Sequence, residues 1–178
     1  MPVKMTKKKM VKSKAIDLSS NAPKSHRPFV EKCKENIFAS QKKASIAVNS
    51  ELIKLYWSIG KNLTERQEQE GWEIKTFEKL AHDIQNAFPQ IEGFSVRNIF
   101  RMMEFYQSYR TMAQTESQLE RLSIFNLPWG HNIILLQGLK DPETRLWYAS
   151  KTIENGWGRK DLQRWIEAKL HKCEGKQC

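Results

Sequence analysis

Three polar residues near the middle of the chain have the types and spacing of residues that contact DNA bases. Arg97, Asn98 and Arg101 follow Ser95, which is a good N-cap for a helix. Arginine pairs with the O6 and N7 atoms of guanine, and asparagine pairs with the N6 and N7 atoms of adenine. We therefore predict that Ser95 and these three residues contact DNA. The alternative is a solvated helix face without a ligand.

The sequence predicts no catalytic residues, no metal site and no cofactor. It contains neither a phosphate-binding glycine motif nor a GxSxG nucleophile motif. The three cysteines and four histidines have no zinc-like spacing, which favours reduced thiols. His131 precedes an apolar run and is interpreted as a structural residue at a helix start rather than as a catalytic base.

One fragment resembles half of a metal-dependent nuclease site. Glu167 and Lys169 have E-x-K spacing, and Asp161 precedes them on the same predicted helix. A nuclease site needs carboxylates that converge on a divalent ion. Helical spacing would place Glu167 and Lys169 about 200° apart, on different faces, so the match is interpreted as coincidence.

Positive charge is concentrated at the N-terminus. The formal net charge is +10, and residues 1–27 contain eight basic side chains against one acidic side chain, without a helical apolar stripe. This segment is predicted to be a flexible basic arm that is attracted to polyanions, with nucleic acid as the preferred target and anionic membrane as the second. The arm residues predicted to contact DNA phosphates are Lys7, Lys8, Lys9, Lys12 and Lys14. The alternative is a solvated terminus without a target.

Hydrophobic periodicity predicts a mainly α fold, with a helical domain over residues 28–172 and a short tail at 173–178. Helical patterns cover residues 28–71, 74–88 and 95–109, and the first could be one helix or two, broken near Asn49 or Gly60. The second and third are amphipathic and are joined by a short segment containing Gly93. This arrangement predicts a helix-turn-helix whose second helix enters the major groove.

The C-terminal third of the chain is also predicted to be helical. Residues 111–127 have a mixed pattern of a loop with a short helix, and residues 131–139 form a buried helix or strand. Asp141 and Pro142 are a strong helix start, and that helix is expected to end near Gly156, before a last amphipathic helix. No transmembrane segment or secretory signal is found, which predicts a cytoplasmic protein without a membrane partner.

Blocks of sequence over roughly residues 30–170 resemble the N-terminal domain of the YhcG-like nuclease family. They include LYWSIGK at 55–61, LAHDIQ at 80–85, GFSVRNI at 93–99, LPWGHNI at 127–133 and IENGW at 153–157. The resemblance implies a helix-turn-helix module, winged in some interpretations, that precedes a PDDEXK nuclease domain. The sequence departs from the family in ending at Cys178, before a nuclease domain, and in having Gly158 where similar sequences often have serine.

The residues and the resemblance together predict a non-enzymatic module that binds double-stranded DNA through the helix at 95–109. The alternative is a protein-interaction module that docks a separate PDDEXK nuclease subunit or forms a homo-oligomer. A third interpretation is a remnant of a longer nuclease. A salt-dependent interaction with duplex DNA distinguishes the first interpretation, and a large exposed apolar patch with a stable oligomer distinguishes the second.

Overall fold

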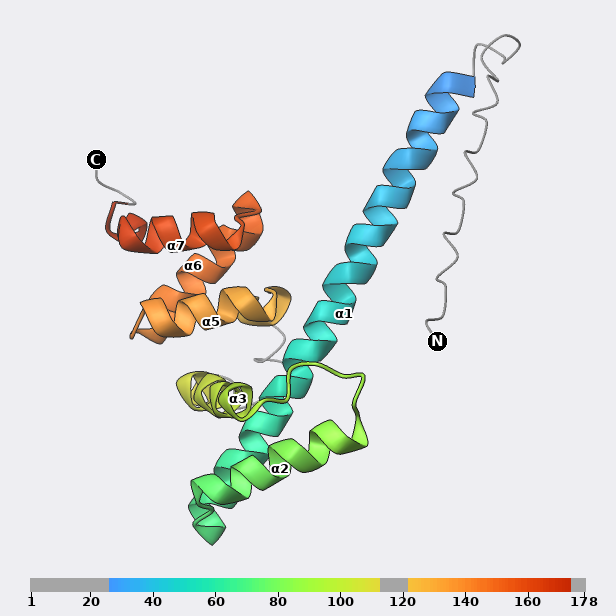
Figure 1. Ribbon diagram of the computed structural model, residues 1–178. Coiled ribbons are helices and arrows are strands. Elements are labelled where there is room, and N and C mark those ends of the chain that lie inside the picture. Colours follow the sequence, from blue (N-terminus) through green and yellow to red (C-terminus); the bar gives the residue numbers. More distant parts are fainter. Residues whose placement is uncertain (1–25, 113–121, 174–178) are drawn as a thin grey trace, which may run out of the picture. The chain divides into compact units, whose positions relative to one another are not determined.

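A computed structural model describes residues 26–112 and 122–173, and every regular element within these two ranges is a helix (Figure 1). The elements are α1 (His26–Glu70), α2 (Ile74–Ala87), α3 (Val96–Tyr109), the 3₁₀ helix η1 (Ser123–Asn126), α5 (Trp129–Gly138), α6 (Pro142–Asn155), α7 (Arg159–Glu167) and the 3₁₀ helix η2 (Leu170–Lys172). The predicted mainly α fold is confirmed, and no strand that could form a wing occurs in the described ranges.

Contacts divide the chain into a first unit of residues 1–41 and a second unit of residues 42–178. In the first unit, the described residues belong to α1, and nearly all of their side chains are exposed. The helix includes His26 and Arg27, which the sequence had assigned to the basic arm. Proline is compatible with the first turn of a helix, so Pro28 does not prevent α1 from starting two residues earlier.

Helix α1 is continuous, which answers the question that the sequence left open: there is no break at Asn49 or Gly60. It ends at Glu70, and the following Gly71 has a φ of +65°, the left-handed conformation typical of the residue after a helix. The amide of Gly71 donates to the carbonyl of Gln67 at 3.0 Å. The final turn of α1 thus follows the local signal that the glycine provides.

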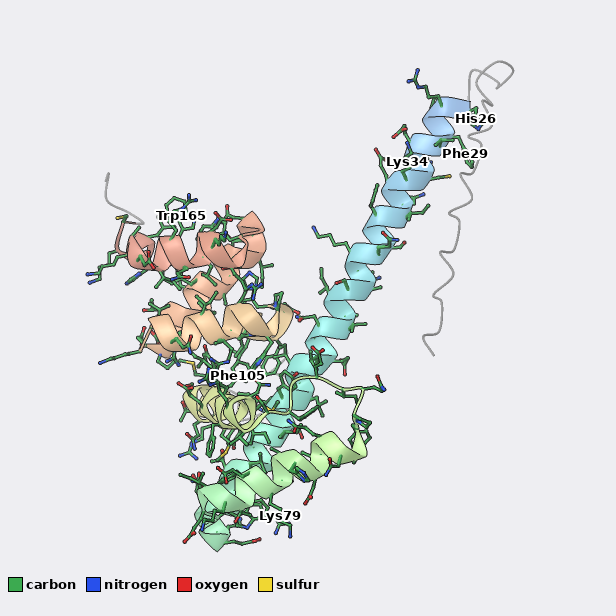
Figure 2. The ribbon with its side chains drawn as sticks, in the orientation of Figure 1. His26, Phe29, Lys34, Lys79, Phe105 and Trp165 are labelled. Carbon is green, nitrogen blue, oxygen red and sulfur yellow. The ribbon has the colours of Figure 1, made fainter. Side chains whose placement is uncertain are left out.

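The second unit is organised around aromatic side chains that bring α1, α3 and the C-terminal helices together. The Trp57 ring of α1 makes edge contacts with Phe105 of α3 and Phe125 of η1, at centroid distances of 5.8 and 5.6 Å. Phe105, which is labelled in Figure 2, is fully buried. It also contacts Trp129 of α5. Aromatic burial of this kind is a major source of stability in a small domain.

Helices α1 and α3 cross at very short distance. Gly60 lies directly against the main chain of α3, and a Cβ atom at this position would be 2.1 Å from the carbonyl oxygen of Met102. Beside the crossing, Leu63 packs with Ile99 and Met103 in an apolar cluster that also includes Phe77 of α2. Glycine is therefore required at residue 60 for close approach of the two backbones rather than for flexibility.

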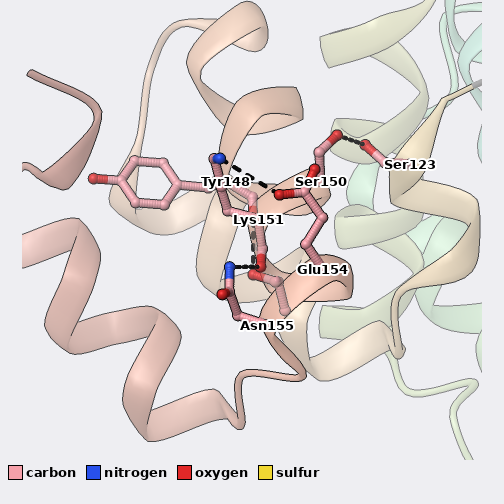
Figure 3. Close-up of polar contacts among 7 residues, drawn as sticks. Ser123, Tyr148, Ser150, Lys151, Glu154 and Asn155 are labelled. Carbon is pink, nitrogen blue, oxygen red and sulfur yellow. Dashed lines mark hydrogen bonds and ion pairs between the residues drawn. The ribbon is translucent and has the colours of Figure 1, made fainter. Parts of the chain in front are cut away.

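The termini of α6 follow the sequence signals closely. Asp141 caps the helix by accepting a hydrogen bond from the Thr144 amide at 2.8 Å, and Gly156 ends it with a φ of +63°. On one side of α6, Ser150 donates to Ser123 of η1 at 3.2 Å, whereas Tyr148 points to the other side (Figure 3). There the Tyr148 hydroxyl donates to the carbonyl of Trp165 in α7 at 2.9 Å. Helix α6 thus links η1 to α7.

Residues 131–139, for which the sequence allowed a helix or a strand, belong mainly to helix α5. Its residues Ile133, Leu135 and Leu136 are buried in the same core cluster as Leu162 and Ile166 of α7. None of the helices in the described part of the chain has both the length and the apolar character needed to cross a membrane.

Candidate nucleic-acid interface

Hydrogen bonds fix the segment that enters α3. Residues 88–95 connect α2 to α3, and this connection is longer than the three- or four-residue turn of a typical helix-turn-helix. Gln85 of α2 donates to the Phe94 carbonyl at 3.0 Å, and the Ser95 hydroxyl accepts from the Asn98 amide at 3.3 Å. The predicted N-cap role of Ser95 is confirmed. Its contact with DNA stays a prediction.

Gly93 makes a close approach within this connection. Its φ of +102° is strained for any residue with a side chain, and a Cβ atom there would lie 2.5 Å from the Tyr56 hydroxyl of α1. The connection therefore packs directly on α1, and the start of α3 is held in one position.

Arg97 and Arg101 lie on the side of α3 that is least covered. Arg97 is exposed and Arg101 is half-buried. Neither guanidinium forms a hydrogen bond or an ion pair with another residue in the described ranges. Glu104, one turn further along, is exposed on the same side. The first turns of α3 therefore present two unpaired cations, and a carboxylate follows them.

Asn98 does not belong to this exposed face, and the prediction that its amide contacts adenine is wrong. Its side chain is buried, with 9% of its surface exposed. Its Nδ2 donates to the Gly93 carbonyl at 2.5 Å, and its Oδ1 accepts from Trp129 Nε1 of α5 at 2.7 Å. Both ends of the amide are in use. The sequence pattern predicts that Asn98 lies at the edge of the exposed face of α3. In the structure, three helices (α1, α2 and α5) pack on α3, so the buried face of α3 is wider than its single apolar stripe indicates.

Replacing Asn98 by alanine is expected to lower the free energy of unfolding by about 2–4 kcal/mol. The Trp129 indole N–H and the Gly93 carbonyl would both lose their hydrogen-bond partner where water has little access. Urea denaturation followed by tryptophan fluorescence measures this change. Asn62→Ala, at an exposed position of α1, is the control and should change the free energy of unfolding by no more than about 0.5 kcal/mol. Equal stability of the two variants would contradict the structural role of Asn98.

His131 lies near the start of α5, as predicted, and joins it to the segment before α7. Its Nε2 is 3.1 Å from the carbonyl oxygen of Trp157. A carbonyl can only accept, so Nε2 carries the proton and Nδ1 is left as an acceptor. Nδ1 is buried and has no partner among the described residues. Burial lowers the pKa of His131 below its ordinary value, and the positive charge of Arg159 acts in the same direction.

We expect the stability of the protein to fall as the pH falls below about 6.5, the ordinary pKa of histidine. The folded state disfavours protonated His131, so the unfolded chain takes up this proton at a higher pH than the folded chain does. Proton uptake therefore stabilises the unfolded chain, and the free energy of unfolding falls as the pH is lowered. Melting temperatures between pH 7.5 and 5.5 measure the effect. His131→Gln should weaken this dependence, and Asn62→Ala, at an exposed and non-titrating position of α1, should leave it unchanged.

The E-x-K fragment is arranged differently from the sequence-based expectation. Glu167 is the last residue of α7, and Lys169 follows with a left-handed φ of +54°. The chain is no longer helical at Lys169, so the separation of about 200° expected for a helix does not apply. The side chains of Glu167 and Lys169 line one open groove of about 410 Å³ between α5 and α7, together with Gln163. Within the described residues, no group of three or more His, Cys, Asp or Glu side chains could hold a metal ion.

The predicted arm contacts Lys7, Lys8, Lys9, Lys12 and Lys14 lie outside the described residues. The site that the structure does describe is therefore the start of α3. It consists of Arg97 and Arg101 on an exposed helix face whose orientation is fixed by Asn98, Gly93 and Trp129.

The fold and this site define an all-helical module with a rigidly held cationic helix start. A comparison with family models matches residues 32–173 to the DUF1016 N-terminal domain, and the chain belongs to this family. This is the YhcG-like N-terminal domain that the sequence resembles, a family associated with nuclease-type proteins. No nuclease domain is found in the 178 residues. The comparison with curated proteins found no match, and neither did the comparison with solved structures.

Proposed function

We propose that the chain is a module that binds double-stranded DNA through the start of α3. The observation that carries this proposal is the pair of unpaired guanidinium groups, Arg97 and Arg101, at the start of α3. Hydrogen bonds tie the start of this helix and the segment before it to α2 and α5. A fixed orientation of the helix matters because an arginine contacts guanine with two parallel hydrogen bonds, and the helix must hold the guanidinium at the correct angle in the major groove. The family's association with nuclease-type proteins supports a DNA ligand.

The charge of the chain supports the same ligand. The net charge is +10, and residues 1–25, which precede α1, contain seven basic side chains against one acidic side chain. We propose that they are a basic arm whose lysines neutralise phosphates. A cytoplasmic location is part of the proposal. We also propose that this module does not cut DNA by itself and works with a nuclease domain.

Titration of a labelled duplex with the full chain at several salt concentrations tests the proposal. We expect tight binding at low salt and a linear fall of log K with log[salt], because each phosphate contact releases counterions. Absence of binding at low salt would overturn the DNA-binding function. The same titration with Mg²⁺ or Mn²⁺ should leave the duplex intact.

A protein-interaction module is the second candidate, and one observation favours it. Helix α1 exposes large apolar side chains, among them Phe29, Ile37, Phe38 and Val48, with exposed fractions of 66, 55, 68 and 72%. Large apolar side chains exposed in this number on one helix favour an interface with another protein. A separate PDDEXK nuclease subunit or a second copy of the chain could cover it. Light scattering distinguishes the candidates: a stable oligomer without affinity for DNA would favour this one.

A further inference from the structure

The N-terminal ends of α5 and α7 lie against each other. Arg159, the first residue of α7, packs on Gly130 in the first turn of α5, where a Cβ atom would be 3.1 Å from Arg159 Cδ. His131 of α5 reinforces this contact through its hydrogen bond to the Trp157 carbonyl. The position of Arg159 is therefore set by two contacts between the helices, and its charge is close enough to lower the pKa of His131 further than burial alone does.

This end of α7 is positively charged and open. Arg159 and the following Lys160 are both exposed, and neither has a hydrogen bond or ion pair with another residue in the described ranges. Asp161 is next in the chain, but its carboxylate pairs with Arg164 at 3.3 Å. Residues 156–164 contain three basic side chains and one acidic side chain, so the start of α7 attracts an anionic partner.

The same end is connected to the start of α3. Trp129 is the first residue of α5, and its indole donates to Asn98 in the first turn of α3 at 2.7 Å. The chain of contacts from Asn98 through Trp129 and Gly130 to Arg159 thus joins the starts of α3, α5 and α7. The N-caps of α5 and α7, Pro128 and Gly158, give no side-chain hydrogen bond. Their uncapped ends add the positive ends of two helix dipoles to the charges of Arg159 and Lys160.

We propose that Arg159 and Lys160 are a second contact with the phosphate backbone of the DNA that α3 binds. This inference rests on the proposed function and extends its site from one helix to two. Unpaired cations at two connected helix starts complement a polyanion of regularly spaced phosphates better than they complement a protein surface of mixed charge. Phosphate contacts of this kind fix the register of a protein on DNA without reading sequence, so the second contact would orient α3 in the groove.

The double variant R159Q/K160Q of the full chain tests the proposal by titration of a labelled duplex at several salt concentrations. Two lost phosphate contacts should flatten the slope of log K against log[salt] by roughly 2 and weaken binding on the order of ten- to a hundred-fold at 0.1 M salt. The control is K140Q/K172Q, which removes the same charge from exposed lysines beyond the C-terminal ends of α5 and α7. R159K should retain most of the affinity, which separates the charge of Arg159 from its packing on Gly130.

The outcomes distinguish this inference from the proposed function. If the unmodified chain binds duplex but R159Q/K160Q matches K140Q/K172Q in slope and affinity, the second contact is wrong and the α3 site stands. If the unmodified chain does not bind duplex at low salt, both are wrong. A selective loss in R159Q/K160Q, with an unchanged melting temperature, supports the inference.

Discussion

Replacement of Gly60 by alanine is expected to lower the free energy of unfolding by about 1–3 kcal/mol, although alanine is the better helix former by about 1 kcal/mol. The new Cβ atom would lie 2.1 Å from the carbonyl oxygen of Met102, so α1 and α3 would have to separate. Backbone cannot move aside as a long side chain can. The apolar cluster of Leu63, Ile99 and Met103 beside the crossing would lose packing as a result.

The matched control is Gly130→Ala, also inside a helix. There the new Cβ atom would meet the side chain of Arg159, at 3.1 Å from Cδ, and that flexible side chain can shift. In urea denaturation, we expect Gly130→Ala to leave the free energy of unfolding unchanged or slightly raised. We expect Gly60→Ala to lower it clearly in the same assay. Similar stability of the two variants would show that α1 and α3 are not in close contact at Gly60.

The double variant R97Q/R101Q is expected to weaken binding to duplex DNA by about 1–3 kcal/mol for each arginine, which is the range for one good contact between a side chain and a base. Its fold should survive, since a substitution on an exposed face usually changes the free energy of unfolding by no more than about 0.5 kcal/mol. Fluorescence anisotropy with a labelled duplex measures the loss, and K140Q/K172Q controls for the removal of two charges. Affinity equal to that of this control would exclude the start of α3 as the DNA site.

The fold was predictable from the sequence wherever a local signal sets the end of a helix. Ser95 and Asp141 cap helices as expected, and Gly71 and Gly156 end helices in the left-handed conformation. These signals work because a cap or a C-terminal glycine needs only its own helix turn. The length of α1 was less predictable, because the glycine within it could equally have marked a break.

The candidate site was only partly predictable, because two of its features depend on contacts between distant segments. Arg97 and Arg101 were found from their types and helical spacing. The role of Asn98 depends on Trp129, which lies far along the chain, and a helical projection of α3 alone cannot show that partner. Similarly, Arg159 carries no motif of its own, and only its contact with Gly130 connects it to the other helix starts.

The most direct test of the central claim is chemical-shift mapping of the full chain with a short DNA duplex, recorded by amide NMR spectroscopy. If α3 binds DNA, the largest shift changes should fall on the amides of residues 95–101, and they should weaken as salt is added. Amides on the exposed side of α1 in residues 26–41 should change least. Changes confined to α1, or no changes at low salt, would contradict the claim that the start of α3 is a DNA-binding site.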